Sequence, residues 1–187
     1  MKKKDCYDLN AIDNISKFVL AHKFTDERSK KNCIEFLSQI KNSCYNQILA
    51  KYYLKKYTKI DERILFVCDG FENYKNAFNK LFYRVAKLHF GVPIACKKYG
   101  LEHNNNPIER YNGKIKDRIK SIHSGFKNFA DAENFLNLRR IIHNFVNPNQ
   151  ELKGKTPAEV AEIKIPLGKN KLLDLIQYVK DNYTPLS

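Results

Sequence analysis

The run Ile64-Leu65-Phe66-Val67-Cys68-Asp69-Gly70 decides the fold class. A continuous apolar stretch that ends at an Asp-Gly turn signal is typical of a strand buried on both faces. Two strands are predicted upstream, over 7–12 and 17–24, with the turn Asp13-Asn14 between them, and another is predicted over 84–90. Because helical patterns alternate with these strands, the sequence predicts a mixed α/β fold.

Apolar side chains at helical spacing predict the helices. One helix begins near Ser29, and the tyrosine-rich stretch after it is expected to continue as helix. The clearest start signal is Asn104-Asn105-Asn106-Pro107, because asparagine caps a helix and proline suits its first position. Thr156-Pro157 gives a similar signal. Further helices are expected over 74–81, 130–146 and 171–183.

The composition is that of a globular protein. Of 187 residues, 43% are hydrophobic and 29% are charged, and a chain of this length can bury about two-thirds of its unfolded surface. No apolar run approaches the roughly 18 residues that span a bilayer, and the basic start has no apolar stretch behind it. We therefore expect no membrane partner and no secretion. The five cysteines form no C-x-x-C pair, which favours free thiols and a cytoplasmic location.

The net charge of +14 is unevenly distributed. Residues 1–60 carry 13 basic and 6 acidic residues, and residues 97–155 carry 12 and 6. The segments 61–96 and 156–187 are nearly neutral, with 5 basic against 4 acidic residues and 4 against 4. Two basic blocks suit a polyanion partner such as nucleic acid. The charge alone leaves open a lysine-rich surface without such a partner.

Two acidic residues stand out by their placement. Asp69 lies at the end of the buried strand, where open α/β sheets present ligand-binding groups. Glu109 lies in the first turn of a well-capped helix. Hard oxygen ligands suit Mg²⁺ or Mn²⁺, and such a pair could support phosphoryl transfer. The ordinary alternatives are a common Asp-Gly turn and a glutamate that favours the helix dipole.

Several motifs, in the correct order, resemble those of DDE-type insertion-sequence transposases. They are D-G-x-x-x-Y-x-x-A at 69–77, N-N-x-I-E-R at 105–110, K-x-R-x-K…G-F at 116–126, H-N-F at 143–145 and L-x-G-x-T-P-A-x-x-A at 152–161. The paired strands and Arg28-Ser29 before the first helix also fit. The resemblance covers about residues 7–163, which we interpret as one catalytic-type domain, with 164–187 as a helical extension.

The resemblance implies an RNase H-like fold, as in retroviral integrases, with a mixed sheet flanked by helices. It implies an Asp, Asp, Glu active site that binds two Mg²⁺ or Mn²⁺ ions, in which Asp69 is the second acid and Glu109 the third. It further implies a DNA partner and a homo-oligomer. The candidate DNA contacts are Arg110, Lys114, Lys116, Arg118 and Lys120, which would position phosphates without reading bases.

The chain departs from the family pattern at its start. The strand that carries the first catalytic Asp, and the DNA-recognition region before it, have no counterpart here. Asp13 matches a turn rather than that ligand, although Asp8 could supply it. We therefore expect a transposase fragment that lacks its first strand and has impaired catalysis, because the metals would lose a bridging carboxylate.

Three functions stay open from the sequence. The first is a transposase catalytic-domain fragment that carries out metal-dependent phosphoryl transfer on DNA. The second is a non-catalytic nucleic-acid-binding protein derived from a transposase, with a steep salt dependence. The third is an unrelated interaction domain with a lysine-rich surface.

Overall fold

The computed structural model describes residues 6–58, 60–92, 106–122 and 126–182. Its elements confirm the mixed α/β class. In chain order they are β1 (Tyr7–Ile12), β2 (Val19–Thr25), α1 (Lys30–Thr58), β3 (Leu65–Val67), α2 (Glu72–Phe82), β4 (Lys87–His89), α3 (Asn106–Lys120), α4 (Phe129–Ile141), η3 (Ile142–Val146), η4 (Gln150–Leu152), α5 (Pro157–Val160) and α6 (Lys171–Asn182).

The chain divides into two compact units. The first unit comprises residues 1–12 and 20–121, and the second comprises 13–19 and 122–187. The hairpin turn therefore belongs to the second unit, whereas most of the hairpin belongs to the first. The predicted border at 163/164, which marks the extent of the transposase resemblance, stays a prediction.

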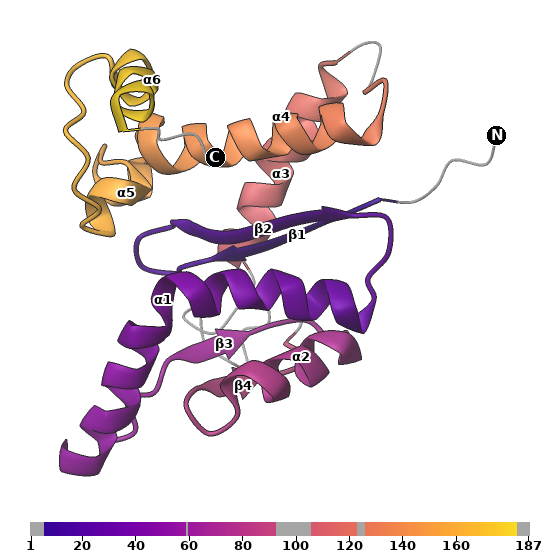
Figure 1. Ribbon diagram of the computed structural model, residues 1–187, viewed down its shortest axis with the longest axis vertical. Helices are drawn as coiled ribbons and strands as arrows, with labels where there is room; N and C mark the ends of the chain where they lie inside the picture. The colour runs from indigo at the N-terminus through magenta and orange to yellow at the C-terminus, as the bar shows by residue number, and fades with distance from the viewer. Residues whose placement is uncertain (1–5, 59, 93–105, 123–125, 183–187) are drawn as a thin grey trace. The chain divides into compact units, whose positions relative to one another are not determined.

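The first unit contains two small sheets. The strands β1 and β2 form one sheet, and β3 and β4 form the other. In the second sheet the strands are parallel, with Leu65 opposite Lys87 and Val67 opposite His89. A parallel pair needs a crossover between its strands, and α2 provides it. Figure 1 shows α1 and α2 running close together in this unit.

The helix α1 contributes the largest share of the first unit's core. Its buried side chains meet Leu9 and Ala21 of the hairpin and Phe78 and Phe82 of α2 in one hydrophobic cluster. From β3, Phe66 packs its ring 5.3 Å from that of Phe78 and 5.0 Å from that of Phe82. Burying each such ring contributes about 1.5–3 kcal/mol. Both small sheets are thereby fixed to α1 and α2.

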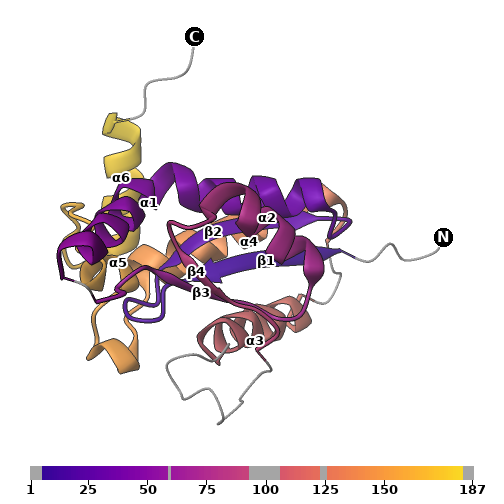
Figure 2. The ribbon, with the colours of Figure 1, turned by 90° about the horizontal axis from the view of Figure 1, so that it is seen from below.

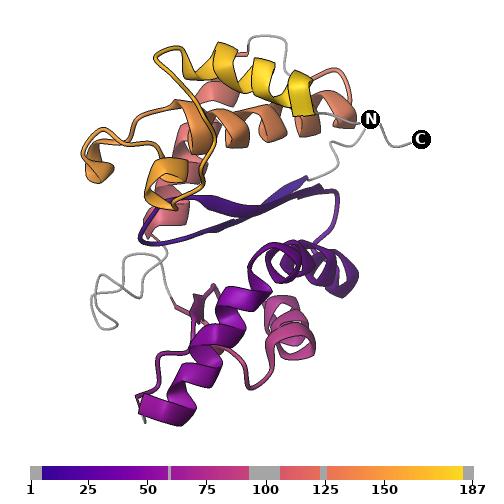
Figure 3. The ribbon, with the colours of Figure 1, turned by 60° about the vertical axis from the view of Figure 1, so that its left-hand side comes forward.

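A second helix, α3, covers the other face of the hairpin, as Figures 2 and 3 show. Neighbouring strand residues point to opposite faces. Leu9 accordingly joins the cluster with α1, while the Asn10 side chain donates to Asn112 Oδ1 of α3 at 3.3 Å. Tyr111 and Ile115 of α3 are buried. The opposite side of α3 is left for solvent.

Two helices of the second unit begin at side-chain caps, of which the sequence predicts the one at Thr156. Thr156 forms a capping box with Glu159, and Pro157 follows at the first helical position of α5. Asn128 caps α4 by accepting the Asp131 amide at 2.9 Å. Beyond Ile141 the helix changes to the π-helical turn η3, so the single helix expected over 130–146 is wrong in its last turn.

Three predicted strands are shorter than expected. The strand expected within 64–68 is Leu65–Val67, and its three residues are half-buried rather than buried on both faces. The strand expected over 17–24 begins at Val19, because Lys17 has a φ of 59° and closes the turn. The strand expected over 84–90 is reduced to Lys87–His89. The helix α2 continues to Phe82 and Arg84 has a φ of 68°, so the chain turns before it extends.

Among the described residues, none of the helices combines the length and the apolar character that crossing a membrane requires.

Candidate functional site

Asp69 lies just beyond β3, as its sequence position predicts. Backbone pairing with the β4 segment continues past the end of β3. The Cys68 amide donates to the His89 carbonyl oxygen at 3.1 Å, and the Val92 amide donates to the Cys68 carbonyl oxygen at 3.1 Å. The Asp69 carboxylate accepts the Phe71 amide at 3.2 Å through Oδ1. This bond is the ordinary turn role of an Asp-Gly pair at the start of a helix.

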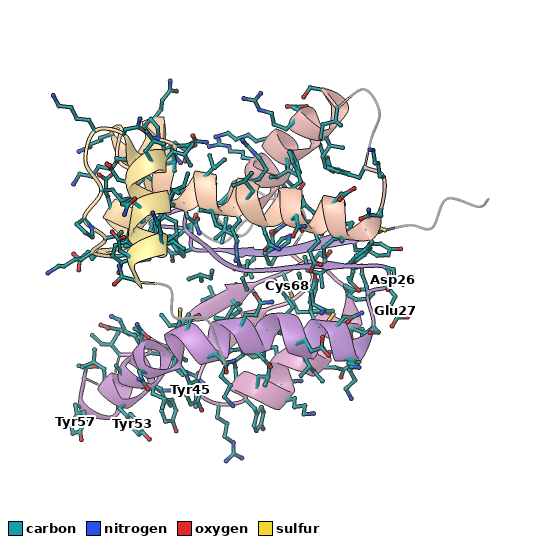
Figure 4. All side chains as sticks on the ribbon, turned by 45° about the horizontal axis from the view of Figure 1, so that its top comes forward. Asp26, Glu27, Tyr45, Tyr53, Tyr57 and Cys68 are labelled. Atoms are coloured by element: carbon teal, nitrogen blue, oxygen red, sulfur yellow. The ribbon has the colours of Figure 1, made fainter. Side chains whose placement is uncertain are left out.

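The other Asp69 oxygen faces an arginine. Arg28 Nη2 lies 3.3 Å from Asp69 Oδ2. Arg28 lies in the connection between β2 and α1, together with Asp26 and Glu27. Figure 4 labels Asp26 and Glu27, and it also labels Cys68, the residue before Asp69. The transposase resemblance uses Arg28 only as part of the approach to the first helix, and nothing in the sequence signals a pairing with a residue 41 positions away.

The two acids considered for the first catalytic position have protein partners. Asp8 Oδ1 lies 2.6 Å from the buried His22 Nε2. Asp13 Oδ2 accepts the Ser16 amide at 2.6 Å and the Ser16 hydroxyl at 2.7 Å, so it closes the hairpin turn. The turn interpretation of Asp13 is confirmed.

The described residues do not by themselves fit a divalent-metal centre. In 6–58, 60–92, 106–122 and 126–182, no three His, Cys, Asp or Glu side chains come together in a group that could hold a metal ion. Glu109 lies in the first turn of α3, as predicted. Asp69 contacts Arg28 rather than another acid. A Mg²⁺ or Mn²⁺ site that includes Asp69 and Glu109 therefore stays a prediction.

The predicted DNA contacts all lie on the solvent side of α3. The five exposed side chains are Arg110, Lys114, Lys116, Arg118 and Lys120. Residues four apart share one side of a helix. Arg110, Lys114 and Arg118 therefore follow one edge of the exposed side. Lys116 and Lys120 follow the other edge, together with Glu109. Lys120 also lies 3.7 Å from Asp117.

Part of the first basic block, residues 1–60, lies on α1, where exposed tyrosines accompany the lysines. Tyr45, Tyr53 and Tyr57 project from this helix (Figure 4), and Tyr57 is 84% exposed. Two of the lysines nearby are paired with acids of the following loop. Lys51 lies 3.1 Å from Glu62, and Lys55 lies 3.6 Å from Asp61. These pairs partly neutralise the positive charge at this end of α1.

The H-N-F motif at 143–145 holds the hairpin turn. His143 Nε2 lies 2.9 Å from the Lys17 carbonyl oxygen. Asn144 bonds both backbone groups of Val19, and Phe145 meets Phe18 edge to face at 5.7 Å. The interpretation of His143 as a packed helix residue agrees with these contacts. The sequence did not indicate what the motif packs against.

Burial changes the acidity of the groups around Asp69. It raises the pKa of the Cys68 thiol to about 12, and the Asp69 charge acts in the same direction. Burial also raises the pKa of the Tyr74 phenol and of the Cys33 thiol. The raised pKa values favour the neutral forms of these groups at physiological pH. Among the described cysteines, Cys33, Cys44 and Cys68 have free thiols.

Comparison of the chain with protein-family models, with curated proteins and with solved structures found no match. The resemblance to DDE-type transposases rests on the sequence motifs.

Proposed function

We propose that this protein is a nucleic-acid-binding protein derived from a DDE-type transposase, and that it binds DNA phosphates through α3. The observation that carries the proposal is the distribution of charge on this helix. Five basic side chains are exposed on the side away from the hairpin, against the two acids Glu109 and Asp117. Basic side chains clustered along one helix are the electrostatic signature of a phosphate-binding surface.

The order of helices and strands supports descent from a DDE-type transposase, whose catalytic domain has an RNase H-like fold. An antiparallel hairpin is followed by a helix and then by a parallel strand pair. This is the order expected for such a fold without its first strand. In the part of the chain that the structure describes, the two sheets are separate, and a family strand that would lie between them is not among the described strands.

The test is the salt dependence of DNA binding, measured by fluorescence anisotropy with a short labelled duplex. We expect affinity to fall steeply with salt, and each lost phosphate contact to reduce the logarithmic slope by about 0.9. The double variant Lys114→Ala/Arg118→Ala removes one edge of α3, and Lys116→Ala/Lys120→Ala removes the other. A reduction of about 2 in the slope is expected for each.

The matched control is Lys169→Ala/Lys180→Ala, which removes two exposed lysines of the second unit and the same net charge. We expect it to keep most of the slope. Affinity that does not depend on salt would contradict the proposal, because binding would then not rest on phosphate contacts. An equal loss of slope in the control would also contradict it, because binding would then not depend on α3 in particular.

Metal-dependent phosphoryl transfer is the second candidate. Asp69 favours it, because it lies at the carboxyl end of a parallel strand, where α/β proteins place ligand-binding groups. Nicking of a DNA substrate with Mn²⁺, abolished in both Asp69→Asn and Glu109→Gln, would establish this activity. Activity that survives both substitutions would come from another protein in the preparation.

A further inference from the structure

Arg28 is held in place by α2 on several sides. Its guanidinium carbon lies 3.9 Å from the centre of the Phe71 ring and 5.4 Å from that of Tyr74. The Asn73 side chain donates to the Arg28 carbonyl oxygen at 2.9 Å. Arg28, which precedes α1, therefore contacts the start of α2 through both its backbone and its side chain.

Asp69 completes this arrangement from the β3 side. Its Oδ2 faces the guanidinium, and its Oδ1 accepts the Phe71 amide. Both carboxylate oxygens are therefore engaged by the same group of residues. The Arg28 side chain is 28% exposed and that of Asp69 is 54% exposed. The pair lies at the surface, and the rings beneath it hold the cation more firmly than an ordinary surface pair.

We propose that Arg28 and Asp69 form a structural closing pair that ties the start of α1 to the start of α2, and that Asp69 serves this pair instead of a divalent cation. A metal ion on Oδ2 would lie beside the positive guanidinium and would be repelled by it. Moving Arg28 aside would separate it from both rings. This inference does not depend on DNA binding by α3, and it argues against the second candidate function, metal-dependent phosphoryl transfer at Asp69.

The sign of a stability change distinguishes the two roles of Asp69. In a metal-free acidic site, neutralising one acid removes repulsion between carboxylates and stabilises the fold. In a closing pair, the same change removes an attraction and destabilises the fold. Asp69→Asn suits this test because the amide oxygen still accepts the Phe71 amide, so that chiefly the charge is lost.

The experiment is a double-mutant cycle in urea with Asp69→Asn, Arg28→Met and the double variant. We expect each single change to lower the folding equilibrium constant about fivefold, a magnitude typical of an ion pair with a cation–π contact. The double variant is expected to lose much less than the product of the two. The control Glu35→Gln breaks the Lys23–Glu35 pair, which lacks ring contacts, and should cost about twofold or less.

The melting temperature measured at increasing Mn²⁺ concentrations gives a second readout. It does not require the Arg28→Met variant to fold. We expect the wild type and Asp69→Asn to respond to Mn²⁺ in the same way. The proposal is overturned if Asp69→Asn is more stable than the wild type. It is equally overturned if Mn²⁺ stabilises the wild type and this stabilisation disappears in Asp69→Asn.

Discussion

The side-chain amide of Asn144 bonds the backbone N–H and C=O of Val19, as the backbone of a neighbouring strand would. Its Oδ1 accepts the Val19 amide at 2.9 Å, and its Nδ2 donates to the Val19 carbonyl oxygen at 3.1 Å. The side chain is part of the π-helical turn η3 and only 3% of the residue is exposed. One amide therefore completes the backbone bonding of the first residue of β2.

Replacing Asn144 by leucine should lower the free energy of unfolding by about 2–4 kcal/mol. The leucine has a similar volume, but it leaves a buried amide and a buried carbonyl of Val19 without partners. Urea denaturation followed by circular dichroism measures the loss. The exposed Asn147 three residues on provides the control, and Asn147→Ala should change stability by less than about 0.5 kcal/mol. Equal losses in the two variants would contradict the role assigned to Asn144.

Gln39 makes the same type of contact with His22 within the first unit. Its Oε1 accepts the His22 amide at 3.2 Å, and its Nε2 donates to the His22 carbonyl oxygen at 2.9 Å. Gln39→Met keeps the shape and removes both bonds, so we expect a loss of about 1–3 kcal/mol in urea denaturation. Gln47→Met, at an exposed position of the same helix, is the matched control and should have little effect. A stable Gln39→Met protein would mean that water replaces both bonds.

The stability of the protein should fall in acid partly through Glu159. The Lys171 ammonium at 2.8 Å and the Thr156 amide at 2.6 Å hold the pKa of this carboxyl down to about 2. A carboxyl whose pKa is lower in the folded state stabilises the fold above its unfolded pKa of about 4.5, and this contribution is lost as the pH falls toward about 2.

Glu159→Gln should therefore flatten the dependence of unfolding free energy on pH between about 5 and about 2. Because the side chain is half exposed, we expect only about 0.5–1 kcal/mol at neutral pH. Lys171→Met removes the larger cause and keeps the Thr156 bonds, so its slope should lie between those of the wild type and Glu159→Gln. A slope unchanged in Glu159→Gln would assign the acid sensitivity to other carboxyls.

Cys68 should resist alkylation in the folded protein. Its thiol has a pKa of about 12, so very little reactive thiolate is present at about pH 8. Cys6 is exposed and should react first with iodoacetamide, as followed by mass spectrometry of peptides. In concentrated urea the two cysteines should react at similar rates. Fast labelling of Cys68 without urea would show that β3 opens readily.

The parts of the fold that the sequence predicts depend on local signals. The turn at Asp13 and the cap at Thr156 each involve residues within three positions, and the structure confirms both. The exposed basic side of α3 follows from helical spacing alone. The division of the strands into two separate sheets depends on pairing between distant segments, and no local pattern encodes it.

The same distinction explains the candidate site. The placement of Asp69 after an apolar strand and of Glu109 in a first helical turn could be predicted, because each is a property of one segment. The contact of Asp69 with Arg28 and that of Asp8 with His22 join separate segments. These contacts decide which carboxylates are available to a ligand, and only the tertiary structure reveals them.

The length of α1 has a consequence for the motions of the protein. The helix runs from Lys30 to Thr58, about 43 Å, yet Ile48 is the last buried residue among those of α1 whose side chains the structure describes. The backbone hydrogen bonds of the helix protect the amide hydrogens of the final turns, and the surface pairs of Lys51 and Lys55 with Glu62 and Asp61 link these turns to the following loop. This end can unwind while the core stays intact. Hydrogen exchange should therefore rise along α1 from its centre to Thr58, and a protease should cleave there first.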